Sequence, residues 1–191
     1  KKTLQNGSLH GVEVDIRRHP ETKEIVLCHD EVSLTKGYTT LLEALQYAKM
    51  HNWHVCIEFK EFDTELFNEV QELLSTLEMC GQALLFGFKE VVAEFNWQAA
   101  RRVPLGIIVE YPWHIARDVR LYQPDTVVLG WDDRAWTQIA FRLWWTVFSL
   151  KKTALRHSVE LFSGVAESQR QVSWLEKQGI HSFTIDMSKV A

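Results

Sequence analysis

The sequence has few cysteines and no long apolar run. Cys28, Cys56 and Cys80 are too few and too scattered for a disulfide framework, and two of them fall in apolar, strand-like runs that favour buried free thiols. A reducing compartment, and hence a cytoplasmic location, is therefore expected. No stretch reaches the roughly 18 uninterrupted apolar residues that span a bilayer, and residues 1–7 lack the apolar core of a signal peptide.

The chain also lacks an excess of positive charge. Its formal net charge is -4, so no general basic field indicates a nucleic-acid partner. No Gly-x-Gly-x-x-Gly turn follows a strand-like run, which argues against an open, doubly wound sheet. No low-complexity linker divides the 191 residues. Residues 1–191 are therefore predicted to form a single domain.

What the chain does contain is an alternation of short β-rich runs with longer amphipathic segments. Strands that alternate with helices of 10 to 15 residues are typical of a parallel sheet built from βαβ units. The β-rich runs are residues 11–16, 24–30, 54–60, 83–88, 104–110, 126–131, 158–163 and 182–186.

The first two runs are joined by residues 17–23, a short polar connection that contains Pro20. This connection is too short for a crossover helix, so the pair is predicted to be an antiparallel hairpin. Seven parallel strands then remain, whereas a (β/α)₈ barrel has eight and typically runs about 250 residues. We therefore expect an α/β fold of the TIM (β/α)₈ type, with its first strand missing from the chain and lying upstream of Lys1.

Two of the predicted strands carry charged side chains on one face. Glu13 and Asp15 alternate with valines, and Glu58 and Lys60 share one face of the run 54–60. In a barrel the valines would pack under helices while the charged groups would reach the mouth, where barrel active sites lie. Oxygen-only ligands of this kind suit Mg²⁺ or Ca²⁺ better than zinc.

Each of these features has a plainer interpretation when it is taken alone. A Glu-x-Asp strand is often simple surface alternation, Glu58 with Lys60 is compatible with a structural ion pair, and His29 with an ordinary polar strand end. The combination is more informative, because all five groups fall near strand ends in one consistent barrel register.

Three motifs together resemble the core signature of the glycerophosphodiester phosphodiesterases, a family related to the phosphatidylinositol-specific phospholipase C-like phosphodiesterases. They are Gly-Val-Glu-Val-Asp-Ile at 11–16, a strand that ends in His29-Asp30, and Ile-Glu-Phe-Lys at 57–60. Residues 39–45 are similar to the family's next helix opening, and residues 179–186 resemble its last strand.

The resemblance implies a barrel that hydrolyses a glycerophosphodiester, or a similar small phosphodiester, in lipid metabolism. It implies that Glu13, Asp15 and Glu58 bind a divalent ion, Mg²⁺ or Ca²⁺. His29 would be one of two catalytic histidines, and Lys60 would act in catalysis by neutralising the phosphate. Arg17 joins Lys60 as a predicted substrate-binding residue.

The sequence departs from the family pattern in ways that matter for activity. The family's other histidine belongs to a His-Arg motif that ends the first strand, and no such motif is present. His10 precedes the strand at the opposite end of the barrel, and His19 lies in the hairpin turn and matches poorly. The 191-residue chain is therefore expected to be an impaired enzyme. Phe-Ser-Gly-Val at 162–165 and Ile185 replace residues that are usual near the substrate.

Two other activities remain compatible with the same residues. A lyase-type reaction would release a cyclic phosphate by internal attack, and a non-catalytic barrel would only bind phosphate ligands. Intact Glu13, Asp15, His29, Glu58 and Lys60 argue against the non-catalytic alternative.

The sequence has eight tryptophans, and several aromatic residues concentrate in residues 135–150, a predicted helix followed by Lys151 and Lys152. The ordinary interpretation is a barrel helix that packs its aromatic face on the sheet. The alternative is peripheral membrane contact through Trp144 and Trp145, since aromatic residues beside lysines suit lipid headgroups.

Overall fold

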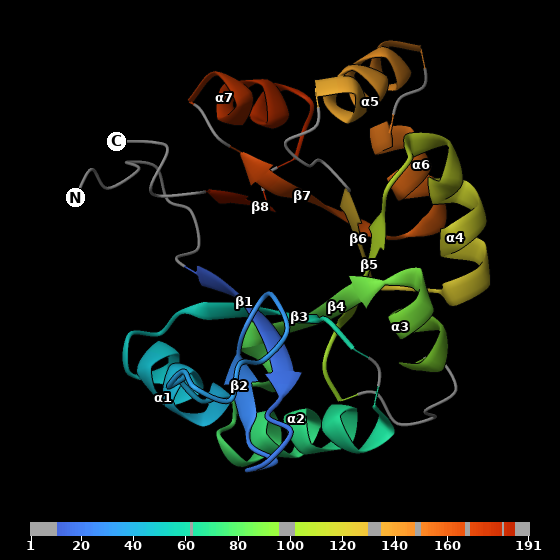
Figure 1. The fold of residues 1–191 in the computed structure, drawn as a ribbon. Coiled ribbons are helices and arrows are strands. Elements are labelled where there is room, and N and C mark those ends of the chain that lie inside the picture. The colour runs from blue at the N-terminus through green and yellow to red at the C-terminus, as the bar shows by residue number, and fades with distance from the viewer. Residues whose placement is uncertain are drawn as a thin grey trace. The chain divides into compact units, whose positions relative to one another are not determined.

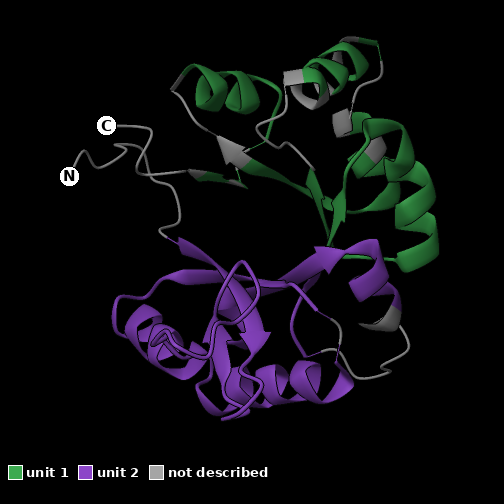
Figure 2. Ribbon diagram, viewed as in Figure 1, with its two compact units in different colours: residues 1–2, 106–191 green, residues 3–105 purple. Residues whose placement is uncertain are grey.

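The computed structural model describes residues 11–61, 63–95, 102–129, 135–147, 150–166, 169–180 and 182–185. The chain divides into two compact units (Figure 2): unit 2 is Thr3–Leu105, and unit 1 is Lys1–Lys2 with Gly106–Ala191. Within the described residues, no helix is both long enough and apolar enough to span a bilayer.

The sheet of unit 2 contains the hairpin that the sequence predicts. Strands β1 (Gly11–Arg18), β2 (Ile25–Leu27), β3 (His54–Phe59) and β4 (Ala83–Phe88) lie in the order β2-β1-β3-β4 (Figure 1). Strands β1 and β2 pair antiparallel, with Ile16 opposite Leu27. The pairs β1–β3 and β3–β4 are parallel.

The helices of unit 2 begin at capping residues that the sequence encodes. Thr40 and Glu43 form a capping box at the start of α1 (Leu41–Met50), and the Asp63 side chain accepts a hydrogen bond from the Glu65 amide at the start of α2 (Thr64–Thr76). Such caps satisfy amide groups that have no partner within the helix. The short helices η1 (Cys80–Gln82) and α3 (Lys89–Phe95) flank β4.

Unit 2 has its own apolar core, which forms because the outward face of the sheet is covered by helices. Side chains from β3 and α2 meet there, as in the pair Phe59 and Phe67, whose ring centroids are 6.0 Å apart. Fully buried core residues include Ile16, Leu41, Leu45, Ile57, Leu66, Phe67 and Leu74.

Unit 1 repeats the alternation of strands with helices. Strands β6 (Thr126–Leu129), β7 (Glu160–Ala166) and β8 (Ser182–Ile185) follow β5 (Leu105–Val109), and each consecutive pair is parallel. The connecting elements are η2 (Pro112–His114), α4 (Ile115–Tyr122), α5 (Ala135–Val147), α6 (Leu150–His157) and α7 (Gln169–Lys177).

Several boundaries differ from the sequence-based expectation. Strand β2 ends at Leu27, so His29 and Asp30 lie beyond the strand rather than at its end. Strand β7 begins at Glu160 rather than at 158, because Ser158 has a φ of 55° and its amide closes the turn after α6 by donating to the Leu155 carbonyl. Of the predicted helix 135–150, α5 covers Ala135–Val147, and residues 148 and 149 lie outside the described residues.

Candidate metal centre

The register of β1 against β3 gathers the predicted carboxylates on one face of the sheet. Glu13 lies opposite Cys56 and Asp15 lies opposite Glu58, and side chains two residues apart on a strand share a face. One carboxylate oxygen from each of Glu13, Asp15 and Glu58 lies within 4.8 Å of the others. The structure therefore brings together the three residues that the sequence predicts as metal ligands.

Lys60 joins this cluster just beyond the end of β3. Its Nζ lies 2.6 Å from Glu58 Oε1 and 3.0 Å from Asp15 Oδ1. The side chains of Lys60 and Glu58 are only 12% and 9% exposed. Three ionised carboxylates and one ammonium group leave a net charge of about -2, which is the charge that one bound Mg²⁺ or Ca²⁺ would balance.

Burial and nearby charges shift the pKa values of Glu58, Lys60 and Cys56. Burial raises the pKa of Glu58, and the ion pair with Lys60 opposes that rise. Burial alone would lower the pKa of Lys60, but its hydrogen bonds to Glu58 and Asp15 raise it overall, so the ammonium group stays charged. Burial, with a contribution from Glu13, raises the pKa of the Cys56 thiol to about 12.

The donor set fits a hard divalent cation. All the carboxylate oxygens come from rigid strands, and oxygen ligands are those that Mg²⁺ and Ca²⁺ prefer. The Cys56 thiol lies on the same face but is protonated at neutral pH, so it offers no thiolate to a softer metal such as zinc. Metal binding by Glu13, Asp15 and Glu58 stays a prediction.

His29 lies in the segment after β2, where it pairs with its neighbour. His29 Nδ1 is 2.9 Å from Asp30 Oδ1, and the two side chains are 72% and 92% exposed. The hydrogen bond to His29 lowers the pKa of Asp30. A carboxylate on Nδ1 leaves Nε2 as the ring nitrogen that can exchange a proton with a substrate.

Arg17 makes its contacts within the protein. Its Nε and Nη2 both donate to the His29 carbonyl at 3.3 Å, and its Nη1 lies 3.6 Å from Glu61 Oε2. Arg17 therefore ties the backbone of His29 to the segment that follows Lys60. The sequence predicts Arg17 as a substrate-binding residue; the observed contacts give it a second role as a clamp on the His29 segment.

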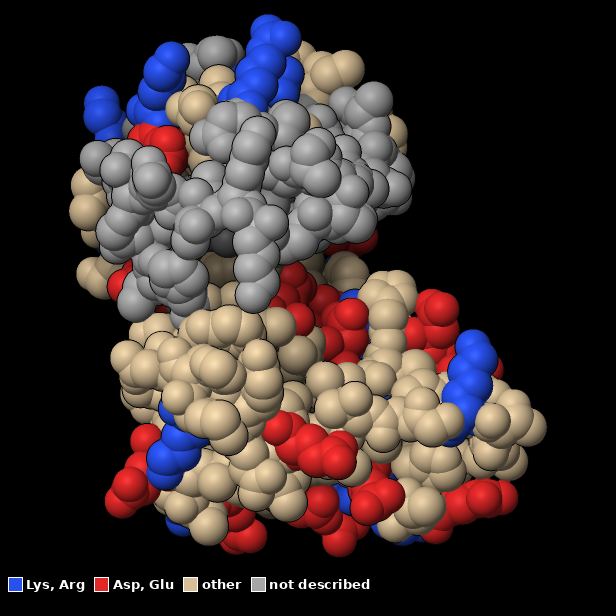
Figure 3. Space-filling view, turned by 90° about the vertical axis from the view of Figure 1, so that its left-hand side faces the viewer, with Lys and Arg blue, Asp and Glu red and all other residues tan. Residues whose placement is uncertain are grey.

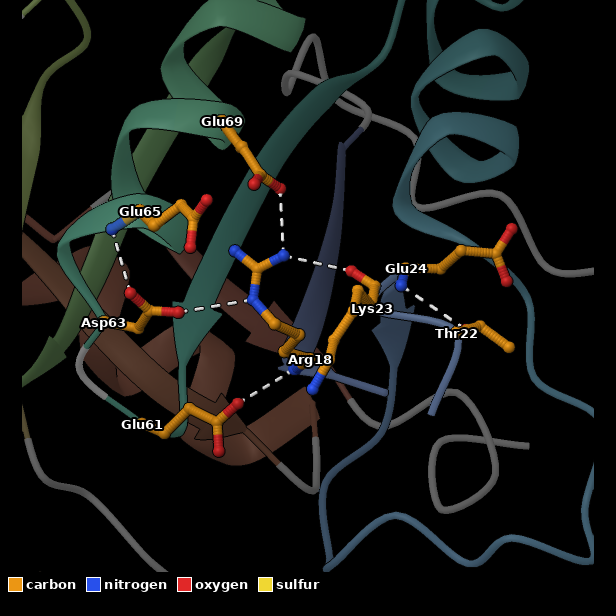
Figure 4. A network of polar contacts seen from close by, with 8 residues as sticks. All are labelled: Arg18, Thr22, Lys23, Glu24, Glu61, Asp63, Glu65 and Glu69. Carbon is orange, nitrogen blue, oxygen red and sulfur yellow. Dashed lines mark hydrogen bonds and ion pairs between the residues drawn. The ribbon is translucent and has the colours of Figure 1, made fainter. Parts of the chain in front are cut away.

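Arg18 forms a polar network that the sequence reasoning missed (Figure 4). Its Nε lies 3.2 Å from Asp63 Oδ2 and its Nη1 lies 3.1 Å from Glu69 Oε2. Nη1 also donates to the Lys23 carbonyl at 3.0 Å, and the Arg18 amide donates to Glu61 Oε1 at 2.8 Å. The network joins the hairpin to Glu61, just after Lys60, and to α2.

The opposite face of β1 lines an apolar pocket of about 400 Å³ beneath α1. Val12 and Val14 form one wall, and Ala44, Tyr47 and Ala48 of α1 form part of the other. The valine face of this strand therefore faces a helix, as expected, but Val12 and Val14 line a pocket there and are half-buried.

The chain matches no protein-family profile and no curated protein sequence. Its fold is similar to that of solved glycerophosphodiester phosphodiesterases. The enzyme from Parabacteroides distasonis aligns with 93% of this chain and 80% of its own, at 13% identity and a TM-score of 0.67. The enzyme from Agrobacterium tumefaciens aligns with 91% of this chain and 82% of its own, at 14% identity and a TM-score of 0.63.

A Galdieria sulphuraria protein described as a candidate enzyme of this kind aligns with 92% of this chain and 81% of its own, at 12% identity and a TM-score of 0.69. These likenesses confirm the predicted fold class, an α/β fold of the TIM-barrel type similar to that of glycerophosphodiester phosphodiesterases. A shared fold does not by itself fix an activity.

Proposed function

We propose that this chain is a divalent-metal-dependent phosphodiesterase that hydrolyses a glycerophosphodiester, or a similar small phosphodiester, to a phosphomonoester and an alcohol. The observation that carries the proposal is the cluster of Glu13, Asp15 and Glu58, with carboxylate oxygens within 4.8 Å of one another, and with Lys60 paired to two of them. The same fold houses phosphodiesterases with which the chain aligns over nine-tenths of its length.

A phosphodiester resists attack because its oxygens are negatively charged, and the cluster has the parts to offset that charge. Glu13, Asp15 and Glu58 would hold the divalent ion, which supplies positive charge next to the phosphate. The Lys60 ammonium adds a second positive charge that the protein keeps fixed and buried beside the same carboxylates. Fixed charges in a buried site stabilise developing negative charge without reorganising at the moment of reaction.

His29 is the proposed proton-transfer residue. Asp30 holds its Nδ1 at 2.9 Å, and Arg17 holds its carbonyl, so both the ring and the backbone are oriented. Imidazole suits either the general base or the general acid near neutral pH.

We also propose that residues 1–191 by themselves turn over slowly. The sequence supplies only one histidine at a position expected of the catalytic pair, and general acid–base help is worth about 10²–10⁴-fold in rate. Turnover by this chain at rates typical of complete enzymes would contradict that expectation.

The first experiment measures metal binding, because it tests the cluster independently of turnover. Isothermal titration with Mg²⁺ and with Ca²⁺ is expected to show one site in the parent protein. Glu58→Gln should weaken binding at least about tenfold, since it removes one of three charged ligands. The matched control is Glu72→Gln, an exposed carboxylate on α2, which should bind as the parent does. Equal affinity in the parent and both variants would contradict the proposed site.

Product analysis then separates the candidate reactions. Glycerophosphocholine incubated with metal-loaded protein should give glycerol phosphate and choline, at a rate that Glu58→Gln abolishes. A cyclic glycerol phosphate would instead show the lyase reaction. Metal and phosphate binding with no turnover would support the non-catalytic alternative.

A further inference from the structure

Helix α5 carries several large apolar side chains that are exposed. Trp136, Ile139, Leu143 and Val147 are 47%, 56%, 62% and 71% exposed. At about 100° per residue their spacing places all four within roughly 80° of one another. We call these four residues the α5 stripe. Scattered exposed apolar residues are ordinary, but a contiguous exposed apolar face marks an interaction site.

An aromatic cluster fixes α5 in this orientation. Trp144, which is half-buried, packs on Trp113 of η2 with ring centroids 5.9 Å apart. Tyr111 stacks on Trp113 at 5.1 Å and contacts Trp136 at 5.6 Å. Trp136 therefore lies at the edge of the α5 stripe, against the aromatic cluster, and Ile139, Leu143 and Val147 form its most exposed part.

The sequence indicates Trp144 and Trp145 as candidate residues for membrane contact. Trp144 is engaged with Trp113, and the side chain of Trp145 lies outside the described residues. Among the described side chains of α5, the α5 stripe supplies the exposed apolar surface, and Trp113 of η2 is 46% exposed.

Charge distinguishes this region from the rest of the chain. Residues 135–159 contain four Lys or Arg residues and no Asp or Glu, although the chain as a whole has a net charge of -4. The side chains of Arg142, Lys152 and Arg156 are exposed. In the face drawn in Figure 3, several basic side chains project at the top of the view, and acidic ones predominate in its lower half.

We propose that the α5 stripe docks on an anionic lipid surface, in a role independent of the proposed phosphodiesterase activity. An exposed apolar helix face beside basic residues is the pattern of helices that lie in the membrane interface. Negatively charged headgroups attract the basic residues, and tryptophan is favoured at headgroup depth.

A second copy of the chain is the less favoured occupant. A two-fold contact brings the same patch of each copy together. It would therefore oppose two stretches that each carry four positive charges and no negative ones, and like charges across an interface oppose association.

Vesicle co-sedimentation tests the proposal. The protein should sediment with vesicles of phosphatidylcholine and phosphatidylserine, sediment weakly with phosphatidylcholine alone, and be released by added salt. The double variant Leu143→Gln with Val147→Gln should lower the partition coefficient at least about tenfold, because binding scales with buried apolar area. Leu121→Gln is the matched control: Leu121 is 63% exposed on α4, outside the basic stretch, and its variant should bind as the parent does.

Two further measurements test whether the α5 stripe itself contacts lipid and whether each variant remains folded. Trp136→Phe should reduce the blue shift of tryptophan emission that vesicles cause, and circular dichroism should show that each variant keeps the parent's helix content. Absence of binding to any vesicle, or a double variant that binds as tightly as the parent, overturns the proposal. So does a dimer in sedimentation equilibrium that the double variant abolishes, because the α5 stripe would then be an interface between copies.

Discussion

Lys60 neutralises part of the negative charge of the carboxylate cluster, and its replacement should leave that charge uncompensated. Its ammonium group lies 2.6 Å from Glu58 and 3.0 Å from Asp15 and is largely buried. Lys60→Met should lower the free energy of unfolding of the metal-free protein by about 3 kcal/mol, because it leaves buried carboxylates unpaired. Added Mg²⁺ or Ca²⁺ should recover much of that loss. Urea unfolding with and without metal measures both effects.

Lys49→Met is the control for this comparison. Lys49 is half-exposed, and its Nζ lies 3.8 Å from a carboxylate oxygen of the exposed Glu78. Exposed pairs contribute less than about 1 kcal/mol, so this variant should change stability little and should not respond to metal. Similar losses in the two variants would mean that the cluster is as well solvated as the surface.

The three cysteines should differ in their reactivity. Burial and the nearby Glu13 raise the pKa of the Cys56 thiol to about 12, so almost none of it is thiolate at neutral or mildly alkaline pH. The thiolate is the reactive form. Cys56 should therefore be alkylated by iodoacetamide far more slowly than Cys28 or Cys80 in the folded protein. Peptide mass spectrometry over time measures the three rates, and equal rates before unfolding would contradict the assignment.

Replacing Arg17 can show whether this residue positions His29 or binds the substrate. If its main role is to hold the His29 carbonyl, Arg17→Met should lower kcat with little change in KM, and should speed amide hydrogen exchange in residues 28–31. If Arg17 binds the phosphate directly, KM should rise and exchange should be unchanged. The exchange measurement does not depend on turnover, so it remains informative even for a slow enzyme.

Some individual site residues can be predicted from the sequence and others cannot, for a physical reason. Glu13, Asp15 and Glu58 were predictable because side chains alternate strictly along a strand, so that faces can be counted. The link from Arg17 to Glu61 and the network around Arg18 join residues 43 to 51 positions apart. Which acid such an arginine meets is decided by how the hairpin lies against α2, and local sequence does not encode that.

Among the secondary-structure elements, the start of α1 offers a pH-dependent prediction. The Thr40 amide donates to Glu43 Oε2 at 2.8 Å and the Glu43 amide donates to Thr40 Oγ1 at 3.2 Å. The bond from the Thr40 backbone, followed by that from its hydroxyl, lowers the pKa of Glu43. A carboxyl whose folded-state pKa is lowered stabilises the protein above its unfolded-state pKa of about 4.3 and loses this effect as the pH falls through the folded-state value.

Two variants check this capping box by urea unfolding at neutral pH and at a pH below both pKa values. Thr40→Ala should cost about 1 kcal/mol at neutral pH, the usual worth of an N-cap side chain. Glu43→Ala should destabilise the protein at neutral pH, and the difference from the parent should shrink in acid. A destabilisation by Glu43→Ala that is the same at both pH values would show that the carboxylate charge has no part in the cap.

Element types were easier to predict than element ends. The parallel strands and the hairpin follow from short apolar runs and from a connection too short for a helix, and the structure confirms them. The end of β2 at Leu27 was missed because pairing with β1 covers only three residues, Ile16 to Arg18.

For the whole molecule, periodicity predicts that a helix has an apolar face but not which way the face points. The α5 stripe has the spacing of an ordinary core-facing helix, and the sequence-based interpretation places the aromatic face of residues 135–150 on the sheet. The structure shows instead that Trp144 packs on Trp113 of η2, which is itself 46% exposed. Ile139, Leu143 and Val147 stay exposed while Trp136 and Trp144 contact the aromatic cluster, which only the tertiary structure reveals.

The prediction that residues 1–191 form a single domain can be tested through metal binding. All the predicted ligands belong to unit 2, whereas six of the eight tryptophans belong to unit 1. Metal at about 100 times its dissociation constant adds about 2.7 kcal/mol of stability, or about 5–10 °C in melting temperature for a domain of this size. No linker composition separates the two units in the sequence, so we expect one cooperative transition.

Tryptophan emission should therefore show the same metal-induced shift as amide exchange in β1 and β3. Glu58→Gln, which should weaken metal binding at least about tenfold, should reduce the shift seen by both probes at the same metal concentration. A shift confined to β1 and β3, with the tryptophan-monitored midpoint unchanged, would mean that the units unfold independently and that residues 1–191 form two domains. In that case the metal centre would still be defined by unit 2, and the α5 stripe would belong to a unit whose stability the metal does not affect.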